Sequence, residues 1–255
     1  MTDRFSWKKG MAYGVIDSEK VLEECAEGGM DAVEFHHFGE KRDLATWSKN
    51  TGVEIWSRHL IFGHENIAHR TQERVDETVV LYKQLIEEAA EVGAKNVVIH
   101  PSGEPNEDEV REERILRSID AFSKLVEHAK QFGITVCCEN LPRTCLCRDS
   151  DECLRFVESV AGLKLCFDTN HLLKEPHKDF IQRVGKYIQT THVSDYHFID
   201  EEHLWPFDGL IDWKTVLQEL EKADYNGPLI FETGYPGNKT CADVTKTVER
   251  MCRLY

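Results

Sequence analysis

Five short apolar runs in this chain each end on a residue that can bind a metal ion or exchange a proton. A buried strand favours apolar and β-branched residues, so a carboxylate or imidazole at its end has no packing value. Because helical patterns separate the runs, we expect a parallel sheet that gathers these side chains at its carboxyl edge. The runs occupy 97–100, 136–139, 165–168, 189–192 and 229–232, and they end at His100, Glu139, Asp168, His192 and Glu232.

Four of these strand ends combine carboxylate oxygens with an imidazole nitrogen: Glu139, Asp168, His192 and Glu232. Such mixed ligation suits Mn²⁺, Co²⁺, Mg²⁺ or Zn²⁺, and the absence of thiolate favours a harder ion than structural zinc sites hold. Any one of them alone could be an ordinary polar residue hydrogen-bonded at a strand mouth. Four converging buried charges are better explained by a cation. We therefore predict a bound divalent metal, with Mn²⁺ as the first expectation.

The elements that would position these residues alternate regularly along the chain. Eight strands in strict alternation with eight helices predict one closed (β/α)₈ TIM barrel over residues 1–255, a usual length for this fold. The first strand and the sixth helix carry the weakest patterns. The predicted strands are 11–15, 32–36, 53–60, 96–101, 134–140, 163–168, 188–193 and 228–232. The predicted helices are 18–28, 40–50, 71–92, 107–131, 150–161, 178–186, 213–223 and 240–252.

Several motifs of the second half of the chain resemble the xylose-isomerase-like TIM barrel superfamily, and within it the sugar phosphate isomerase/epimerase group. They are Phe-Asp-Thr-Asn-His at 167–171, Thr-His-Val-Ser-Asp at 191–195, the tract 200–213 and Leu-Ile-Phe-Glu at 229–232. In relatives that epimerise ketoses, two glutamates, an aspartate and a histidine hold one divalent ion. The matching positions here are Glu139, Glu232, Asp168 and His192. The resemblance also implies that His171 contacts the substrate.

The resemblance implies an isomerase or epimerase that acts on a sugar or sugar phosphate through a metal-stabilised enediolate. Removing a proton beside a carbonyl needs a Lewis acid on the developing oxyanion and a carboxylate base nearby. If Glu139 and Glu232 act on opposite faces of the substrate, the result is epimerisation. A single base that returns the proton to the neighbouring carbon gives aldose–ketose isomerisation instead.

Other functions remain open alongside this one. His59, His100 and His203 are expected to contact substrate, although His59 and His100 fit a plain hydrogen-bonding role equally well. These three histidines also resemble ligands of apurinic-site endonucleases, which share the fold and carry three zinc ions. Those nucleases have an Asp-Arg-His element, whereas this chain reads Glu201-Glu202-His203. A dehydratase of keto-inositols and a non-catalytic sugar binder are the further alternatives.

Several residues depart from the family pattern or have no settled role. Phe207 replaces the first glycine of a Pro-Gly-x-Gly turn that is common in relatives, and Phe198 stands where ketose epimerases have an arginine. At most one of His36 and His37 can face the pocket, because adjacent side chains on a strand point to opposite faces. Arg143 and Arg148 could hold a substrate anion, whereas the nearby thiols of Cys145 and Cys147 are expected to be incidental. Trp56, Trp205 and Trp213 could stack on a sugar, although at least two of them are expected to pack in the core or at the rim.

The charge and the cysteine content limit the binding partners and the cellular compartment that we expect for this protein. The net charge of −15 disfavours nucleic acid and anionic membrane surfaces as binding partners. The expected partner is therefore a small sugar or polyol, and a homo-oligomer remains open. Nine cysteines without a paired zinc-site spacing, together with an N-terminus that lacks an apolar signal segment, favour a reducing cytoplasm.

Overall fold

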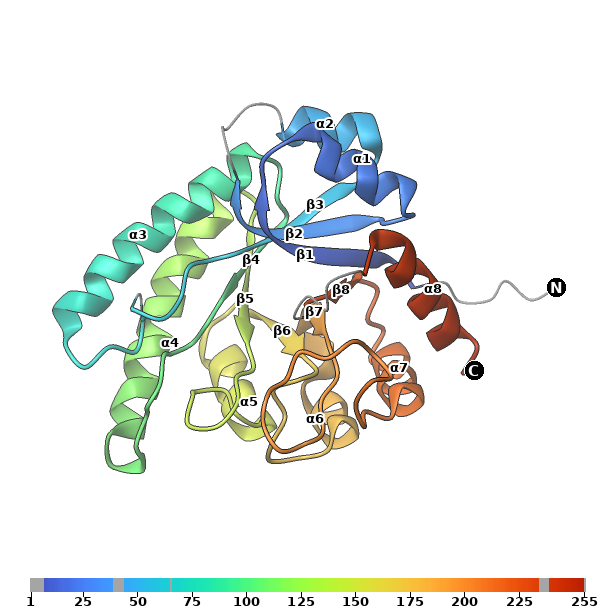
Figure 1. The fold of residues 1–255 in the computed structure, drawn as a ribbon. Coiled ribbons are helices and arrows are strands. Elements are labelled where there is room, and N and C mark those ends of the chain that lie inside the picture. Colours follow the sequence, from blue (N-terminus) through green and yellow to red (C-terminus); the bar gives the residue numbers. More distant parts are fainter. Residues whose placement is uncertain (1–6, 39–43, 65, 234–238, 255) are drawn as a thin grey trace.

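Eight parallel strands close into a barrel that is surrounded by helices (Figure 1). The computed structural model describes residues 7–38, 44–64, 66–233 and 239–254. Each strand pairs with its neighbour in chain order, and β1 pairs with β8 to complete the ring. The predicted (β/α)₈ barrel is confirmed. None of the helices in these ranges is long and apolar enough to cross a bilayer.

The elements follow the predicted order with small changes in their limits. The strands are β1 (Lys9–Ile16), β2 (Ala32–Phe38), β3 (Glu54–His59), β4 (Asn96–Ile99), β5 (Thr135–Glu139), β6 (Lys164–Asp168), β7 (Ile188–Val193) and β8 (Leu229–Phe231). The helices are α1 (Glu19–Glu27), α2 (Leu44–Thr51), α3 (Gln72–Glu91), α4 (Asp108–Lys130), α5 (Ser150–Ser159), α6 (His177–Val184), α7 (Trp213–Lys222) and α8 (Cys241–Cys252), and a 3₁₀ turn, η1 (Gly185–Tyr187), precedes β7.

The weakly patterned first strand proves to be the longest, because it pairs with β2 along most of its length. The short sixth helix is eight residues long and continues into η1. The first residues of the predicted second helix, 40–43, lie outside the described ranges. These differences arise at element ends, where pairing across the sheet decides the limits and local sequence does not.

Two register shifts in the barrel wall aim side chains into its interior. One lies between β2 and β3, where Trp56 is the extra residue and Glu34 comes to face Ser57. The other lies between β6 and β7 and leaves Asp168 directly opposite His192. A bulge of this kind locally redirects the following side chains, and bulges are frequent beside functional sites. The barrel interior below the mouth therefore holds polar groups next to a small apolar cluster of Val98, Cys137 and Cys166.

One buried aspartate organises the long loop between β7 and α7. Asp195 Oδ1 accepts hydrogen bonds from the backbone N–H groups of Tyr196 and Ile211, at 2.9 and 3.0 Å. Its Oδ2 accepts from the backbone of Phe207 and from Trp213 Nε1, both at 2.9 Å. Satisfying these donors fixes the path of a loop that would otherwise bury unpaired backbone groups.

Phe207, the residue that replaces a glycine of the family turn, has a backbone φ of 77°. A bulky residue rarely adopts this left-handed conformation, which costs free energy. The Arg250 guanidinium lies 3.7 Å from the centre of the Phe207 ring, and this cation–π contact offsets part of that cost. Phe207 thus packs the loop and does not line the cavity at the mouth of the barrel.

Gly227 follows α7, where a glycine in the left-handed conformation is common, but it does not adopt a positive φ. Asp224, two residues beyond α7, has the left-handed conformation instead, with a φ of 57°. The glycine is required for close approach, because a Cβ at Gly227 would lie 2.9 Å from the Gln189 carbonyl oxygen and 2.8 Å from the Tyr225 ring. Gly52, Gly93, Gly133 and Gly162, which also follow helices, do have positive φ.

Replacing Asp195 tests the loop architecture. We expect Asp195→Ala to lower the free energy of unfolding by at least about 3 kcal/mol, because several buried N–H donors lose their acceptor and each costs roughly 1–3 kcal/mol. Urea denaturation followed by circular dichroism measures the change. Asp208→Ala, at an exposed position of the same loop, is the matched control and should be nearly neutral. Equal stability of the two variants would contradict this account.

Candidate functional site

The four predicted metal ligands meet at the carboxyl mouth of the barrel. Glu139 and Asp168 end β5 and β6, His192 lies near the end of β7, and Glu232 directly follows β8. One ligand atom from each residue lies within 4.8 Å of the others. His192 Nδ1 is 3.2 Å from Glu139 Oε1, 3.1 Å from Glu232 Oε2 and 3.8 Å from Asp168 Oδ2.

The charges of this cluster fit a divalent cation. Burial raises the pKa of Asp168 to about 6, and repulsion from Glu232 acts in the same direction against the attraction of His171. Asp168 Oδ2 is also buried without a hydrogen-bond partner among the described residues. Three carboxylates crowded around one imidazole are costly unless a cation compensates them. A divalent ion would supply that charge, and Asp168 Oδ2 could bind it as a ligand.

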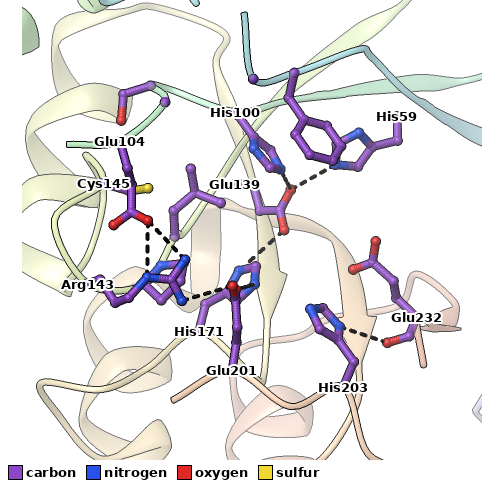
Figure 2. Close-up of a pocket in the computed structure, with 16 residues that line it drawn as sticks. His59, His100, Glu104, Glu139, Arg143, Cys145, His171, Glu201, His203 and Glu232 are labelled. Carbon is purple, nitrogen blue, oxygen red and sulfur yellow. Dashed lines mark hydrogen bonds and ion pairs between the residues drawn. The ribbon is translucent and has the colours of Figure 1, made fainter. Parts of the chain in front are cut away.

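Two further histidines, one at the end of β3 and one directly after β4, anchor Glu139. His59 Nε2 and His100 Nε2 each lie 3.1 Å from Glu139 Oε2. Figure 2 draws both contacts as dashed lines. Burial opposes ionisation of Glu139, but the charges of His192 and His100 outweigh it and hold the pKa of the carboxyl well below its usual range. His59 is fixed in turn by the Leu60 carbonyl, which lies 2.8 Å from His59 Nδ1. The hydrogen-bonding role expected for His59 therefore has direct geometric support, and His100 lies within ion-pair distance of the same carboxylate oxygen.

A second group of possible ligands lies beside the first. His171, Glu201 and His203 also present atoms within 4.8 Å of one another, and His171 Nε2 is 3.2 Å from Glu201 Oε2. Burial disfavours the charged imidazolium, yet Asp168 and Glu201 raise the pKa of His171 to about 10. His203 Nδ1 lies 3.2 Å from the backbone oxygen of Glu232. The two groups are thus neighbours within one site.

Members of both groups line a cavity of about 310 Å³ at the mouth of the barrel (Figure 2). This volume is at the lower end of the range of small-molecule sites, roughly 300–1,000 Å³. Its aromatic wall is Phe62, whose ring stacks on His100 with centroids 4.4 Å apart. The predicted site residues that line it are Glu139, Glu232, His59, His100, His171 and His203, whereas Asp168 and His192 lie beneath it.

Arg143, in the loop after the fifth strand, is not free to hold an anion. Arg143 Nη1 lies 2.7 Å from Asp200 and 2.8 Å from Glu201, and its Nη2 lies 3.0 Å from Glu104. Arg148 faces Glu152 and Asp108 at longer distances, 3.7 and 3.8 Å. An arginine that already pairs with three carboxylates has little capacity left for a substrate anion.

The remaining expectations have mixed outcomes. His36 packs behind the site, with its ring 4.5 Å from that of His59, while His37 is exposed, so one of the two points inward as predicted. Cys145 lines the cavity, but burial raises its pKa to about 12 and leaves it a poor nucleophile. The three tryptophans, Trp56, Trp205 and Trp213, hydrogen-bond within the protein and do not line the cavity.

Four residues of the site had no role in the sequence-based prediction. Phe62, Glu104 and Glu201 come from loops, where no periodic pattern reveals which side chains face a cavity. Glu34 lies inside the apolar strand β2 and contacts His192 from below. Its position offered a signal, because a carboxylate within an otherwise buried strand needs a partner.

Comparison with known proteins places the chain in a family. Two curated proteins are each 28% identical to it: Uncharacterized protein MJ1311 of Methanocaldococcus jannaschii, over 89% of this chain and 81% of that protein, and Uncharacterized protein y4fM of Sinorhizobium fredii, over 61% of this chain. The chain spans about half the length of y4fM, 52%.

Solved structures share the fold. A D-tagatose 3-epimerase-like protein superposes with a TM-score of 0.85 at 24% identity, covering 97% of both chains. The IOLI protein with a bound zinc atom superposes with a TM-score of 0.80 at 20% identity, covering 96% of both. The sequence model of one family matches residues 22–252, which include every residue of the metal-ligand cluster. On this match, the chain belongs to the xylose isomerase-like TIM barrel family.

Proposed function

We propose that this protein is a divalent-metal-dependent isomerase or epimerase of a sugar or related polyol. The observation that carries the proposal is the convergence of Glu139, Asp168, His192 and Glu232 at a cavity into which both glutamates project. The folds shared with a D-tagatose 3-epimerase-like protein and with the zinc-binding IOLI protein support it. Mn²⁺ is our first expectation for the ion, and the zinc of the IOLI protein makes Zn²⁺ the main alternative.

The chain's own residues can perform the proton transfers of such a reaction. A bound divalent cation would supply the Lewis acid that polarises the substrate carbonyl. Burial opposes ionisation of Glu232, but His192 outweighs it and lowers the pKa of that carboxyl, so the group is held in the ionised form that a general base requires. Glu139 is held ionised in the same way. His171 and His203 border the cavity and can orient substrate hydroxyl groups.

The charge of the cavity favours an unphosphorylated substrate. Arg143 is the guanidinium among the described lining residues, no lysine lies there, and three carboxylates already occupy Arg143. Glu104, Glu139, Glu201 and Glu232 also line the cavity, so a phosphate group would meet mostly negative charge. A neutral sugar or inositol avoids this repulsion and can hydrogen-bond the same carboxylates.

A second candidate function is metal-assisted phosphodiester hydrolysis. The grouping of His171, Glu201 and His203 favours it, because this group could hold a second ion beside the first. Two neighbouring metal ions would stabilise the attacking and leaving oxygens of a phosphodiester. The net charge of −15 opposes approach of a nucleic acid, so we rank this function below sugar isomerisation.

Deuterium incorporation separates these functions. In deuterated water with Mn²⁺ or Zn²⁺, we expect one member of a panel of ketoses, aldoses, keto-inositols and their phosphates to acquire carbon-bound deuterium, because proton transfer at carbon exchanges with solvent. Nuclear magnetic resonance detects the exchange and identifies the product as epimer, isomer or dehydrated compound. Cleavage of an abasic-site DNA duplex is the parallel assay. DNA cleavage without deuterium uptake would reject the isomerase proposal.

The two glutamates can be distinguished by conservative substitution. Glu→Gln keeps side-chain size and a ligating oxygen but cannot accept a proton. For a two-base epimerase we expect Glu139→Gln and Glu232→Gln each to lower turnover by at least ~10²-fold, the usual scale for such groups. A one-base isomerase would show a strong loss at one position and a mild loss at the other.

Steady-state kinetics at saturating metal measures these losses. Glu158→Gln, at an exposed position of α5, is the matched control and should leave turnover unchanged. Near-normal turnover in both site variants would place the acid–base work elsewhere, with His171 and His100 as the next candidates.

A further inference from the structure

A buried glutamate that takes no part in the chemistry above lies beneath the metal-ligand cluster. Glu34 is on β2, its side chain points into the barrel interior, and it is fully shielded from solvent. An ionised carboxylate at such a position is costly unless specific partners compensate it. Packing alone would be served better by an apolar side chain, as in the neighbouring small cluster of Val98, Cys137 and Cys166.

The partners of Glu34 are a serine and the histidine of the cluster. Glu34 Oε2 accepts a hydrogen bond of 2.6 Å from Ser57 Oγ, a contact that the register shift between β2 and β3 makes possible. Glu34 Oε1 lies 2.9 Å from His192 Nε2. Neither Glu34 Oε1 nor His192 Nε2 makes a hydrogen bond within the described ranges, so the 2.9 Å ion-pair contact between them is what compensates both buried atoms. The carboxylate and the imidazole therefore depend on each other.

The other nitrogen of the same ring faces the metal ligands. His192 Nδ1 lies about as close to Glu139 and Glu232, at 3.2 and 3.1 Å, as Nε2 lies to Glu34. A neutral imidazole carries one N–H and one lone pair, and a metal ion takes the lone pair. A proton on Nε2, the ring nitrogen closest to Glu34, leaves the lone pair on Nδ1, the nitrogen that faces the cluster. Metal-binding histidines commonly have a carboxylate partner of this kind.

We propose that Glu34 is a positioning residue that keeps the His192 proton on Nε2 and so presents Nδ1 to a divalent cation. Glu34 does not touch the cation or the substrate and acts through His192 alone. Ser57 completes the arrangement, because its hydrogen bond fixes the rotation of the Glu34 carboxylate. The inference rests on the metal centre of the proposed function, but it holds whatever substrate that centre serves.

Metal affinity in the absence of any sugar tests the proposal. Competition titration against a chelator, with Mn²⁺ and separately with Zn²⁺, measures binding to wild type, Glu34→Gln and Glu34→Ala. We expect Glu34→Ala to weaken binding by about 10–100-fold, the scale seen when such a partner is lost. Glu34→Gln should lose less, because its amide oxygen still accepts the Nε2 proton but carries no charge.

A buried glutamate elsewhere provides the matched control. Glu219 on α7 is 5% exposed and contacts Gln182 and Lys222 at the outside of the barrel. Glu219→Gln should bind metal within about twofold of wild type, even if its thermal midpoint falls. Wild-type metal affinity in a folded Glu34→Ala protein would overturn the proposal.

The tautomer of His192 gives a readout that does not depend on a variant folding. Long-range ¹H–¹⁵N spectra of the zinc-loaded wild-type protein distinguish protonated from unprotonated ring nitrogens. We expect the zinc-loaded His192 ring to carry its proton on Nε2 and none on Nδ1. A zinc-loaded ring that carries its proton on Nδ1 would overturn the proposal, whatever the variants show.

Failure of the positioning role is distinguishable from failure of the proposed function. A wild-type protein whose metal affinity depends on Glu34, but which exchanges no deuterium into any sugar, would reject the isomerase and keep the positioning role. Unchanged deuterium uptake in a folded Glu34→Ala protein of normal metal affinity would reject the positioning role and keep the isomerase. A wild type that binds neither ion would reject both.

Discussion

The site depends on the cost of holding three carboxylates close together where water is largely excluded. Glu139, Asp168 and Glu232 share the space around His192, and their ligand atoms lie within 4.8 Å. Coulomb repulsion over such distances is strong in a low-dielectric interior. The surrounding histidines reduce it, since His59 and His100 approach Glu139 from one side and His171 approaches Asp168 from the other. A divalent cation would complete this balance.

The barrel supplies the rigidity that this arrangement requires. Residues at strand ends are held by the ladder on both sides, and the shift between β6 and β7 brings Asp168 and His192 into direct register. The loop after β7 has no such ladder, and Asp195 holds it in place by accepting four hydrogen bonds. This loop also carries Glu201 and His203, so its order extends the rigid site to the wall of the cavity.

The barrel and the convergence of the four strand-end ligands could be predicted from the sequence, because the helical and strand patterns were strong. Helical spacing and apolar runs gave the element order, and polar residues at run ends indicated which side chains would converge. Glu34 escaped prediction because it lies in the middle of its strand, and its partner His192 follows 158 positions later. The pairing of Arg143 with Glu104 and Asp200 was equally hidden, since it joins loops that only the closed barrel brings together. Gly227 shows that a glycine after a helix can serve close packing and need not end the helix.

The most direct test of this account is anomalous diffraction from crystals grown with Mn²⁺ or Zn²⁺, recorded at the absorption edge of each metal. The account predicts an anomalous peak bounded by Glu139, Asp168, His192 and Glu232, at roughly 2.0–2.4 Å from their ligand atoms. Asp168→Ala crystals should show a weaker peak or none there. Absence of density at this position in wild-type crystals that hold the ion elsewhere would contradict the account.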